Sequence, residues 1–333
     1  MFDKKDKPDV APFQLGRAGG KIRRPTCGPA RTNVIDSRKK TMATSRRAFV
    51  TGLGSLAAAA VAGQAWAEPP AGSGFREPVY RVSAAANNSV PKKTHSLDAG
   101  LDLARRALEL SHAKYDTYTA TLVKRERVDG VIGEQEVMFI KVRNRRVENG
   151  QLVSPMSVYL TFLSPASSKG REVIYVENRN NGKITAHEGG VKGRFLPTVS
   201  LAPTGTFAMR GQRYPMTDIG LEKLIEKLIE RGETARQYPD VQAEFRENAR
   251  IKDRSCTVLQ VTQPNKRPDL DFYLAQVFID DELQIPVRYV AYDWPTVAGA
   301  KPEIIEEYTY LDVKMNVPLT DRDFDPENPA YNF

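Results

Sequence analysis

Cysteine is almost absent from this chain of 333 residues, which contains only Cys27 and Cys256. Cys27 lies in a segment that we expect to be removed, so the mature protein would have one cysteine and no internal disulfide. Cys256 occurs in the apolar stretch SCTVLQV. We therefore interpret it as a buried, unreactive thiol, because free cysteine behaves mostly as a small hydrophobic residue.

Histidine is also scarce, and the three histidines, His95, His112 and His187, lie far apart in the sequence. None is spaced with another histidine or a cysteine as in the common metal-binding motifs. The chain also lacks a P-loop, a G-x-S-x-G motif and a G-x-G-x-x-G motif. We therefore predict no metal and no cofactor. An active site built only from carboxylates stays open, since no spacing singles out a pair of acids.

The positive charge of the chain is confined to its N-terminal part. The whole sequence has a formal net charge of +8, which is typical of a nucleic-acid-binding protein. Residues 1–67, however, contain 13 Lys and Arg against 4 Asp and Glu, and the remaining residues contain 36 against 37. The sequence after residue 67 is therefore nearly neutral and gives no electrostatic reason to expect a polyanionic partner.

Residues 42–67 have the organisation of a secretory signal peptide. Arg46 and Arg47 fall in SRRAFV, which resembles the twin-arginine export motif S-R-R-x-F-[LV]. A weakly apolar run follows, and Ala65 and Ala67 form a small-x-small cleavage site. We expect a periplasmic or otherwise exported protein that meets the twin-arginine translocase and signal peptidase. Retention as a membrane anchor is the alternative, but glycines and polar residues interrupt the run.

The domain boundaries follow from composition. We predict a leader over 1–67, with Met42 as a possible true start, a Pro-, Gly- and Ser-rich linker over 68–95, and one domain over 96–333. A long basic segment before the arginines is the alternative to a start at Met42. Within the domain, apolar periodicity predicts a helix that starts at Ser96 and a second helix between Asp218 and Gly232.

Alternating apolar and polar residues predict about nine to eleven strands between and after these helices. Turn residues at Asp129-Gly130, Asn180-Asn181-Gly182 and Asp280-Asp281-Glu282 connect them as hairpins. Hairpins give antiparallel pairing, and a sheet of this size curls because strand twist accumulates. We therefore predict an α+β fold in which a curved antiparallel sheet forms a half-open β-barrel covered by two main helices.

Two stretches near the C-terminus, DDELQIPVRYVAYDWP and EEYTYLDVKMNVPLTDRDFDPENPAY, resemble the LolA/LolB-like superfamily of envelope proteins. The stretches FLSPASSKGREVIYVENRNNGKITAHEGG and AMRGQRYPMTDIGLEKLIEKLIERGE are more similar to a domain-of-unknown-function family of exported planctomycete-type bacterial proteins. The resemblance extends from Leu97 to Asn332 and implies a LolA-like half-barrel. LolA-type carriers normally use the general secretory route, so the twin-arginine leader departs from them, and no functional residue is transferred.

We hypothesise a non-enzymatic periplasmic protein that holds the acyl chain of a lipid or lipoprotein in an apolar groove, since each buried CH2 contributes about 0.8 kcal/mol. An envelope sensor or scaffold that binds another protein, and a carboxylate-based hydrolase, are the alternatives. Three arginines are candidates for a headgroup site, although a structural salt bridge, for example from Arg171 to a neighbouring carboxylate, is the favoured alternative. The candidate ligand-binding residues are Phe139, Tyr159, Phe162, Tyr175, Phe278, Tyr289, Arg171, Arg210 and Arg213.

Overall fold

The computed structural model describes residues 79–80 and 95–333, except residue 298, all within the compact unit Pro69–Phe333. The expected leader, with Arg46, Arg47, Ala65 and Ala67, lies outside the described residues. Within the expected linker, Val79–Tyr80 form the short strand β1. Among the described residues, no helix combines the length and the apolar character needed to cross a membrane.

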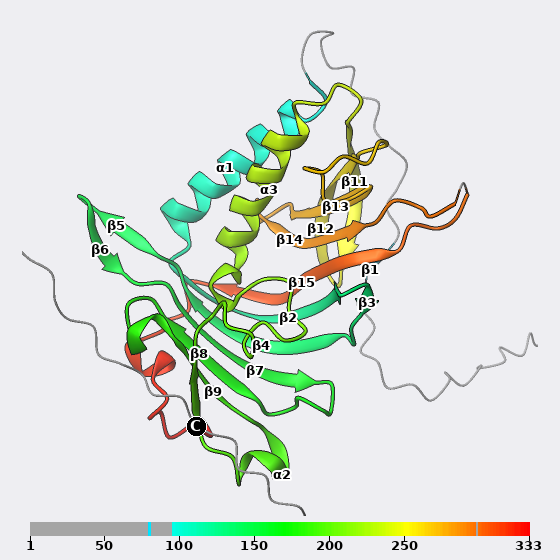
Figure 1. The fold of residues 1–333 in the computed structure, drawn as a ribbon. Coiled ribbons are helices and arrows are strands. Elements are labelled where there is room, and N and C mark those ends of the chain that lie inside the picture. Colours follow the sequence, from blue (N-terminus) through cyan, green and yellow to red (C-terminus); the bar gives the residue numbers. More distant parts are fainter. Residues whose placement is uncertain (1–78, 81–94, 298) are drawn as a thin grey trace, which may run out of the picture. The chain divides into compact units, whose positions relative to one another are not determined.

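One large antiparallel sheet dominates the described part of the chain (Figure 1). Its strand order is β1-β11-β12-β13-β14-β15-β2-β4-β7-β8-β9-β10, with β3 paired to β2 as the thirteenth strand. The strands are β1 (Val79–Tyr80), β2 (Thr117–Val128), β3 (Val131–Ile132), β4 (Glu136–Arg143), β7 (Ser157–Ser164), β8 (Glu172–Val176), β9 (Ile184–His187), β10 (Val199–Leu201), β11 (Gln242–Ile251), β12 (Arg254–Thr262), β13 (Leu274–Asp280), β14 (Pro286–Tyr292) and β15 (Ile304–Met315).

The sheet is open, because its order ends at β1 on one side and β10 on the other. A separate hairpin consists of β5 (Arg146–Glu148) and β6 (Gln151–Ser154). The prediction of a large antiparallel sheet with two helices, not closed into a barrel, is therefore confirmed. The strand count is higher than expected, because strands of two to four residues such as β1 and β3 are too short to show an alternating pattern.

All three predicted turns connect antiparallel strands. Asp129 and Gly130, both with positive φ, separate β2 from β3. The 3-10 turn η1 (Asn180–Gly182) joins β8 to β9, and residues 281–285 join β13 to β14. The hairpin predictions are confirmed, because asparagine, aspartate and glycine tolerate the left-handed backbone that such turns need.

Helices α1 (Asp98–Lys114) and α3 (Leu221–Ala235) lie side by side against one face of the sheet (Figure 1). Two predicted helix ends were wrong. The Ser96 hydroxyl donates to the carbonyl of Val241 rather than capping α1, which begins at Asp98. Gly232 lies inside α3, where a Cβ would come within 2.7 Å of Leu101 on α1, so this glycine permits close helix packing.

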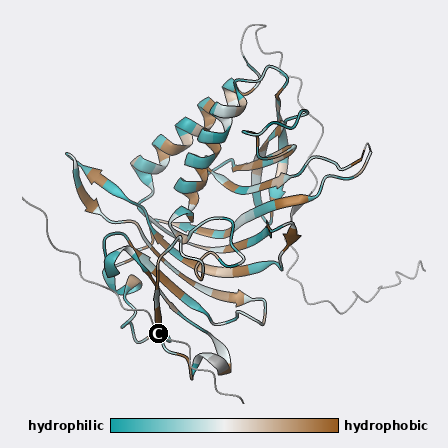
Figure 2. Ribbon diagram, in the orientation of Figure 1, coloured by the Kyte–Doolittle hydropathy of each residue, from teal (hydrophilic) through white to brown (hydrophobic). Residues whose placement is uncertain are grey.

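The start of α3 also differs from the prediction. Asp218 belongs to the 3-10 turn η2 (Met216–Asp218), and the residue that precedes the helix is Gly220. The short helix α2 (Gly190–Gly193) follows β9 at the edge of the sheet. Figure 2 shows hydrophobic and hydrophilic residues alternating along the strands, which gives the sheet two faces that both pack against other parts of the chain.

The face of the sheet turned away from α1 and α3 is partly covered by the C-terminal segment (residues 316–333). The 3-10 helix η3 (Asp321–Phe324) packs on β7 and β8, and its Phe324 is buried. Tyr331 stacks on Tyr159 with ring centroids 4.1 Å apart. Lys141 Nζ donates to both Asp323 and Tyr331. This segment therefore covers the second face of the sheet over β7 and β8 with an aromatic and ionic layer.

Candidate functional site

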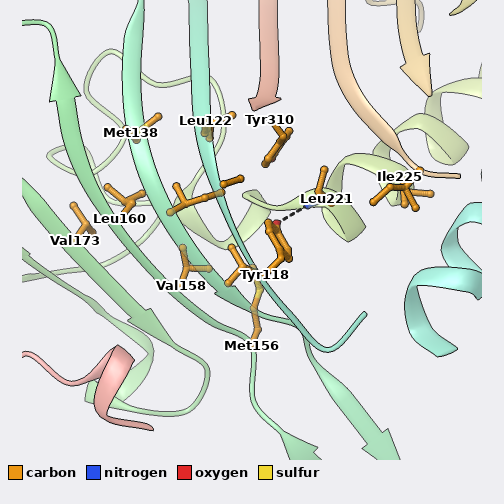
Figure 3. Close-up of a cluster of buried hydrophobic side chains, with 14 of the residues drawn as sticks. Tyr118, Leu122, Met138, Met156, Val158, Leu160, Val173, Leu221, Ile225 and Tyr310 are labelled. Atoms are coloured by element: carbon orange, nitrogen blue, oxygen red, sulfur yellow. Dashed lines mark hydrogen bonds between the residues drawn. The ribbon is translucent and has the colours of Figure 1, made fainter. Parts of the chain in front are cut away.

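A pocket of about 840 Å³ lies between the helix-covered face of the sheet and the segment that leads into α3. Neighbouring strands supply its apolar wall in regular alternation, since every second residue of a strand faces the same side. This wall consists of Leu122, Met138, Leu160, Phe162, Val173, Ile184 and Ala186. Figure 3 shows several of these side chains projecting from adjacent strands toward the start of α3. We call this cavity the concave pocket.

The opposite wall of the concave pocket is formed by residues 202–220, which we call the strap, and by the first turns of α3. The strap has little regular structure and runs from β10 to the helix. The strap contributes both apolar and polar side chains to the concave pocket, which has an apolar end and a polar end. The strap residues that line the pocket are Phe207, Ala208, Arg210, Gln212, Tyr214, Pro215, Met216, Asp218, Ile219 and Gly220.

The polar end of the concave pocket contains two buried glutamates that face each other across neighbouring strands. Glu126 on β2 and Glu306 on β15 are direct partners in the antiparallel ladder, and both are less than 10% exposed. Like charges in this position repel each other. Arg213 of the strap compensates, because its backbone N–H donates to Glu126 at 3.0 Å and its Nε donates to Glu306 at 2.9 Å.

Further donors complete this cluster. Arg231 of α3 donates to Glu306 and to the hydroxyl of Tyr289, both at 2.9 Å. Tyr308 donates to Glu126, and Lys124 donates both to Glu126 and to Gln212 of the strap. The strap and α3 are thus attached to the sheet by charge-assisted hydrogen bonds, the stronger kind in proteins.

The pKa shifts in the cluster follow from burial beside carboxylates. Burial raises the pKa of the Tyr308 hydroxyl, and the negative charges of Glu306 and Glu126 raise it further. For Arg231, burial lowers the pKa, but Tyr289 and Glu306 raise it by more, so the net shift is upward. Tyr308 therefore stays a neutral donor and Arg231 stays a cation over the whole physiological pH range.

Two buried tyrosines position the start of α3 at the apolar end of the concave pocket. The Tyr118 hydroxyl accepts a hydrogen bond from the backbone N–H of Leu221 at 2.9 Å (Figure 3). The Tyr310 hydroxyl accepts one from the N–H of Gly220 at 3.2 Å. The first N–H groups of a helix have no partner within the helix, so these hydroxyls replace the usual capping side chain.

Four of the nine sequence-predicted residues line the concave pocket. Phe162 belongs to its apolar wall, Tyr289 lies at its polar end, Arg210 lies on the strap, and Arg171 lies beside β8. Arg171 forms a salt bridge with Glu188 and stacks on the ring of Phe162. The structural salt bridge that was weighed for Arg171 is therefore present. The side chain of Arg210 is exposed and makes no ion pair within the described residues.

The other five predicted residues lie elsewhere. Phe139 and Tyr159 face the opposite side of the sheet, where they pack beneath the C-terminal segment. Phe278 also faces away from the helices and lies beneath the guanidinium of Arg288. Tyr175 packs against the core next to the pocket wall, and Arg213 belongs to the glutamate cluster. An apolar strand residue gives no sign of which face it occupies when both faces are buried.

The polar residues of the cluster were missed by sequence reasoning. Glu126 and Glu306 are 180 positions apart in the sequence, so only the pairing of β2 with β15 brings them together. The sequence does contain one signal, because charged residues interrupt strand segments that otherwise alternate, as in VKRERV and IIEEYTY. Inward-facing charges of this kind indicate a buried polar cluster.

The residues that follow His187, Glu188-Gly189-Gly190, have a structural role. A Cβ on Gly189 would lie 2.1 Å from the backbone of Gly170, so only glycine lets these two segments touch. His187 Nδ1 lies 3.1 Å from the hydroxyl of Thr198. No group of three or more potential metal-binding side chains occurs within the described residues.

Cys256 is fully buried, and burial raises the pKa of its thiol to about 12. Nearby aspartates raise this pKa further, which disfavours the reactive thiolate.

The sequence of residues 115–333 matches the family described as Protein of unknown function (DUF1571). The match covers more than half of the chain, so the chain belongs to this family. The predicted membership of a domain-of-unknown-function family is confirmed. A search of curated proteins gave no match.

Several solved structures are similar to this chain. A DUF1329 family protein from Desulfovibrio piger is 14% identical, with 70% of this chain and 98% of that chain covered and a TM-score of 0.34. The MucA/MucB complex of Pseudomonas aeruginosa contains a chain that is 14% identical, with coverages of 68% and 60% and a TM-score of 0.37. A LolA superfamily protein from Nitrosomonas europaea is 12% identical, with coverages of 67% and 97% and a TM-score of 0.27.

Proposed function

We propose that this chain is an exported, non-enzymatic binding protein that holds an acyl chain of a lipid or lipoprotein in the concave pocket. The observation that carries the proposal is the pocket itself, whose apolar wall consists of seven aliphatic and aromatic side chains from five neighbouring strands. Its volume of about 840 Å³ falls in the range of ligand-binding cavities. Each CH2 group moved from water into such a pocket contributes about 0.8 kcal/mol.

The position of the headgroup is part of this proposal. Arg210 on the strap lines the pocket and has no ion-pair partner within the described residues. Lys223 and Lys227 of α3 line the same side, each with a glutamate three positions on as its partner. These cations suit an anionic headgroup, with the acyl chain directed toward Leu160 and Val173.

The hydrogen bonds of the two glutamates favour binding over hydrolysis. Glu126 accepts from Tyr308, Lys124 and the backbone of Arg213, while Glu306 accepts from Arg213 and Arg231. A general acid or base must be within hydrogen-bond reach of the reacting group. Carboxylates occupied by five protein donors instead suit the attachment of the strap to the sheet.

Binding of a fluorescent fatty acid to the purified chain tests this function. Ala186→Phe fills the pocket from β9, whereas Thr185→Phe places the same ring on the opposite face of the same strand. We expect Ala186→Phe to weaken binding at least about tenfold, which corresponds to two CH2 groups displaced. We expect Thr185→Phe to bind like the unmodified protein. Equal affinities for all three proteins, or no binding by the unmodified chain, would refute the proposal.

A further inference from the structure

An exposed apolar surface lies at the mouth of the concave pocket. We call it the rim, and it consists of Val191, Phe195, Leu196, Val199 and Phe207. The two phenylalanines are 83% and 80% exposed, unlike most aromatic residues of the described chain. Leu196, Val199 and Phe207 also line the pocket, so the exposed apolar surface continues into the cavity.

The rim is held in place by backbone contacts. Gly189, just before α2, lies so close to the Lys169–Arg171 backbone that a Cβ would come within 2.4 Å of three of its atoms. Gly193 at the end of α2 packs in the same way on the carbonyl of Glu188, and Leu196 N–H donates to Gly193. The side chain of Phe195 therefore projects from a segment of defined conformation, which is seen at the edge of the sheet as α2 in Figure 1.

Cations surround the rim. Lys169 and Arg194 are exposed and form no ion pair within the described residues, and neither does Arg210. The carboxylate of Glu188, just before α2, is already paired with Arg171. The surface at the pocket mouth is thus apolar and aromatic in its centre and positively charged at its border. This composition is typical of protein segments that lie in the interface of an anionic bilayer.

We propose that the rim docks on an anionic lipid bilayer, with Phe195 and Val191 inserted among the acyl chains and Arg194 and Lys169 at the phosphates. The inference rests on the proposed function, because a bilayer would bring its acyl chains to the opening of the concave pocket. A protein partner fits the rim less well, since the unpaired cations would need matching carboxylates, whereas phosphate is present in every anionic lipid surface.

Flotation of the mature chain with lipid vesicles tests the docking. We expect binding to vesicles that contain phosphatidylglycerol and much weaker binding to pure phosphatidylcholine. Combined Val191→Ser and Phe195→Ser should weaken binding at least about tenfold, because two apolar side chains no longer leave water. Arg194→Gln should weaken it about fivefold, and only on the anionic vesicles. Matched controls are Val131→Ser on β3 and Arg106→Gln on α1, both exposed, which should bind normally.

The outcomes separate docking from ligand binding. Val191, Arg194 and Phe195 do not line the concave pocket, so their variants should bind a soluble fluorescent fatty acid as the unmodified chain does. If vesicles bind but the fatty acid does not, the docking is supported and the proposed function fails. Docking is refuted if the unmodified chain ignores anionic vesicles, binds both vesicle types equally, or is insensitive to the rim substitutions. Crosslinking to an envelope protein without vesicle binding would also refute it.

Discussion

Glu126 and Glu306 lie directly opposite each other on β2 and β15, and Arg213 of the strap bonds to both. Two buried like charges in this position are stable only with compensating cations, which the strap and α3 supply as Arg213 and Arg231. At the polar end of the concave pocket, the strap and α3 are therefore attached to the sheet mainly through Glu126 and Glu306. Loss of Glu306 removes the carboxylate that Arg213 and Arg231 share, and leaves Arg231 paired only with the more exposed Asp271.

Glu306→Ala should lower the free energy of unfolding by about 3–5 kcal/mol, the usual cost of breaking a buried ion pair. The strap should also become more sensitive to trypsin at Arg210 and Arg213, since it loses the ion pair between Arg213 and Glu306. Urea unfolding and limited proteolysis measure the two effects. Glu303→Ala is the control, because this exposed carboxylate pairs with Arg127 at the surface. Its removal should lower the free energy of unfolding by less than about 1 kcal/mol. Equal effects of the two substitutions would contradict this view of the strap.

Tyr118→Phe should destabilise the protein by about 1–3 kcal/mol, because the backbone N–H of Leu221 loses its acceptor in a fully buried position. The ring is retained, so no cavity opens and the effect reports the hydrogen bond alone. Tyr175→Phe is the matched control, since no hydrogen bond of its hydroxyl occurs within the described residues and its stability should be nearly unchanged. Chemical unfolding of both variants gives the comparison. An unchanged Tyr118→Phe protein would show that the N-terminus of α3 needs no acceptor.

Gly220→Ala should also be destabilising, because Gly220 has a φ of 121°, which only glycine adopts readily. An added Cβ would lie 3.1 Å from the Tyr118 hydroxyl and disturb the same helix start. We expect a loss of about 1–3 kcal/mol. Gly130→Ala serves as the control, since its Cβ would meet no atom within 4 Å, and only backbone strain would remain. The unfolding temperature of Gly220→Ala should therefore be lower than that of Gly130→Ala. The reverse order would contradict the packing argument.

Asp280 gives the protein a defined response to acid. Burial raises the pKa of this carboxyl, but hydrogen bonds from Arg254 and from the backbone of Leu283 lower it by more, so the pKa lies below its ordinary value of 3.8. A lowered folded-state pKa contributes stability above the unfolded-state pKa and loses it as pH falls through the folded-state pKa. Asp280→Asn should therefore be less stable than the unmodified chain at neutral pH, and the difference should shrink below about pH 4. A difference that does not depend on pH would contradict this assignment.

Local patterns in the sequence predict much of the fold, and long-range pairing accounts for what they miss. The α3 periodicity of Leu221, Leu224 and Ile225 and the turn at Asp129-Gly130 are local signals, and both predictions are confirmed. The predicted end of α3 was wrong because Gly232 does not end the helix. It is a glycine because Leu101 of α1, which is distant in sequence, packs against it and leaves no room for a Cβ. A helix stop and a close helix contact use the same residue type, so sequence alone does not distinguish them.

The candidate site was harder to predict for a related reason. Phe139 on β4 and Phe162 on β7 are both aromatic residues in strands with an alternating apolar and polar pattern. Phe162 nevertheless lines the pocket, whereas Phe139 packs under the C-terminal segment. Both faces of this sheet are covered, so burial does not distinguish the pocket face from the other. The glutamate cluster depends on strand register between β2 and β15, which no local pattern specifies.

Mass spectrometry of an organic extract tests the central claim most directly, on protein purified in its native form from the bacterial envelope. We predict that an acyl-bearing lipid or lipoprotein fragment is recovered with the unmodified chain and with Thr185→Phe, and that its amount falls at least about tenfold with Ala186→Phe. Recovery of no acyl compound from the unmodified chain, or the same amount from the pocket-filling variant, would contradict the account.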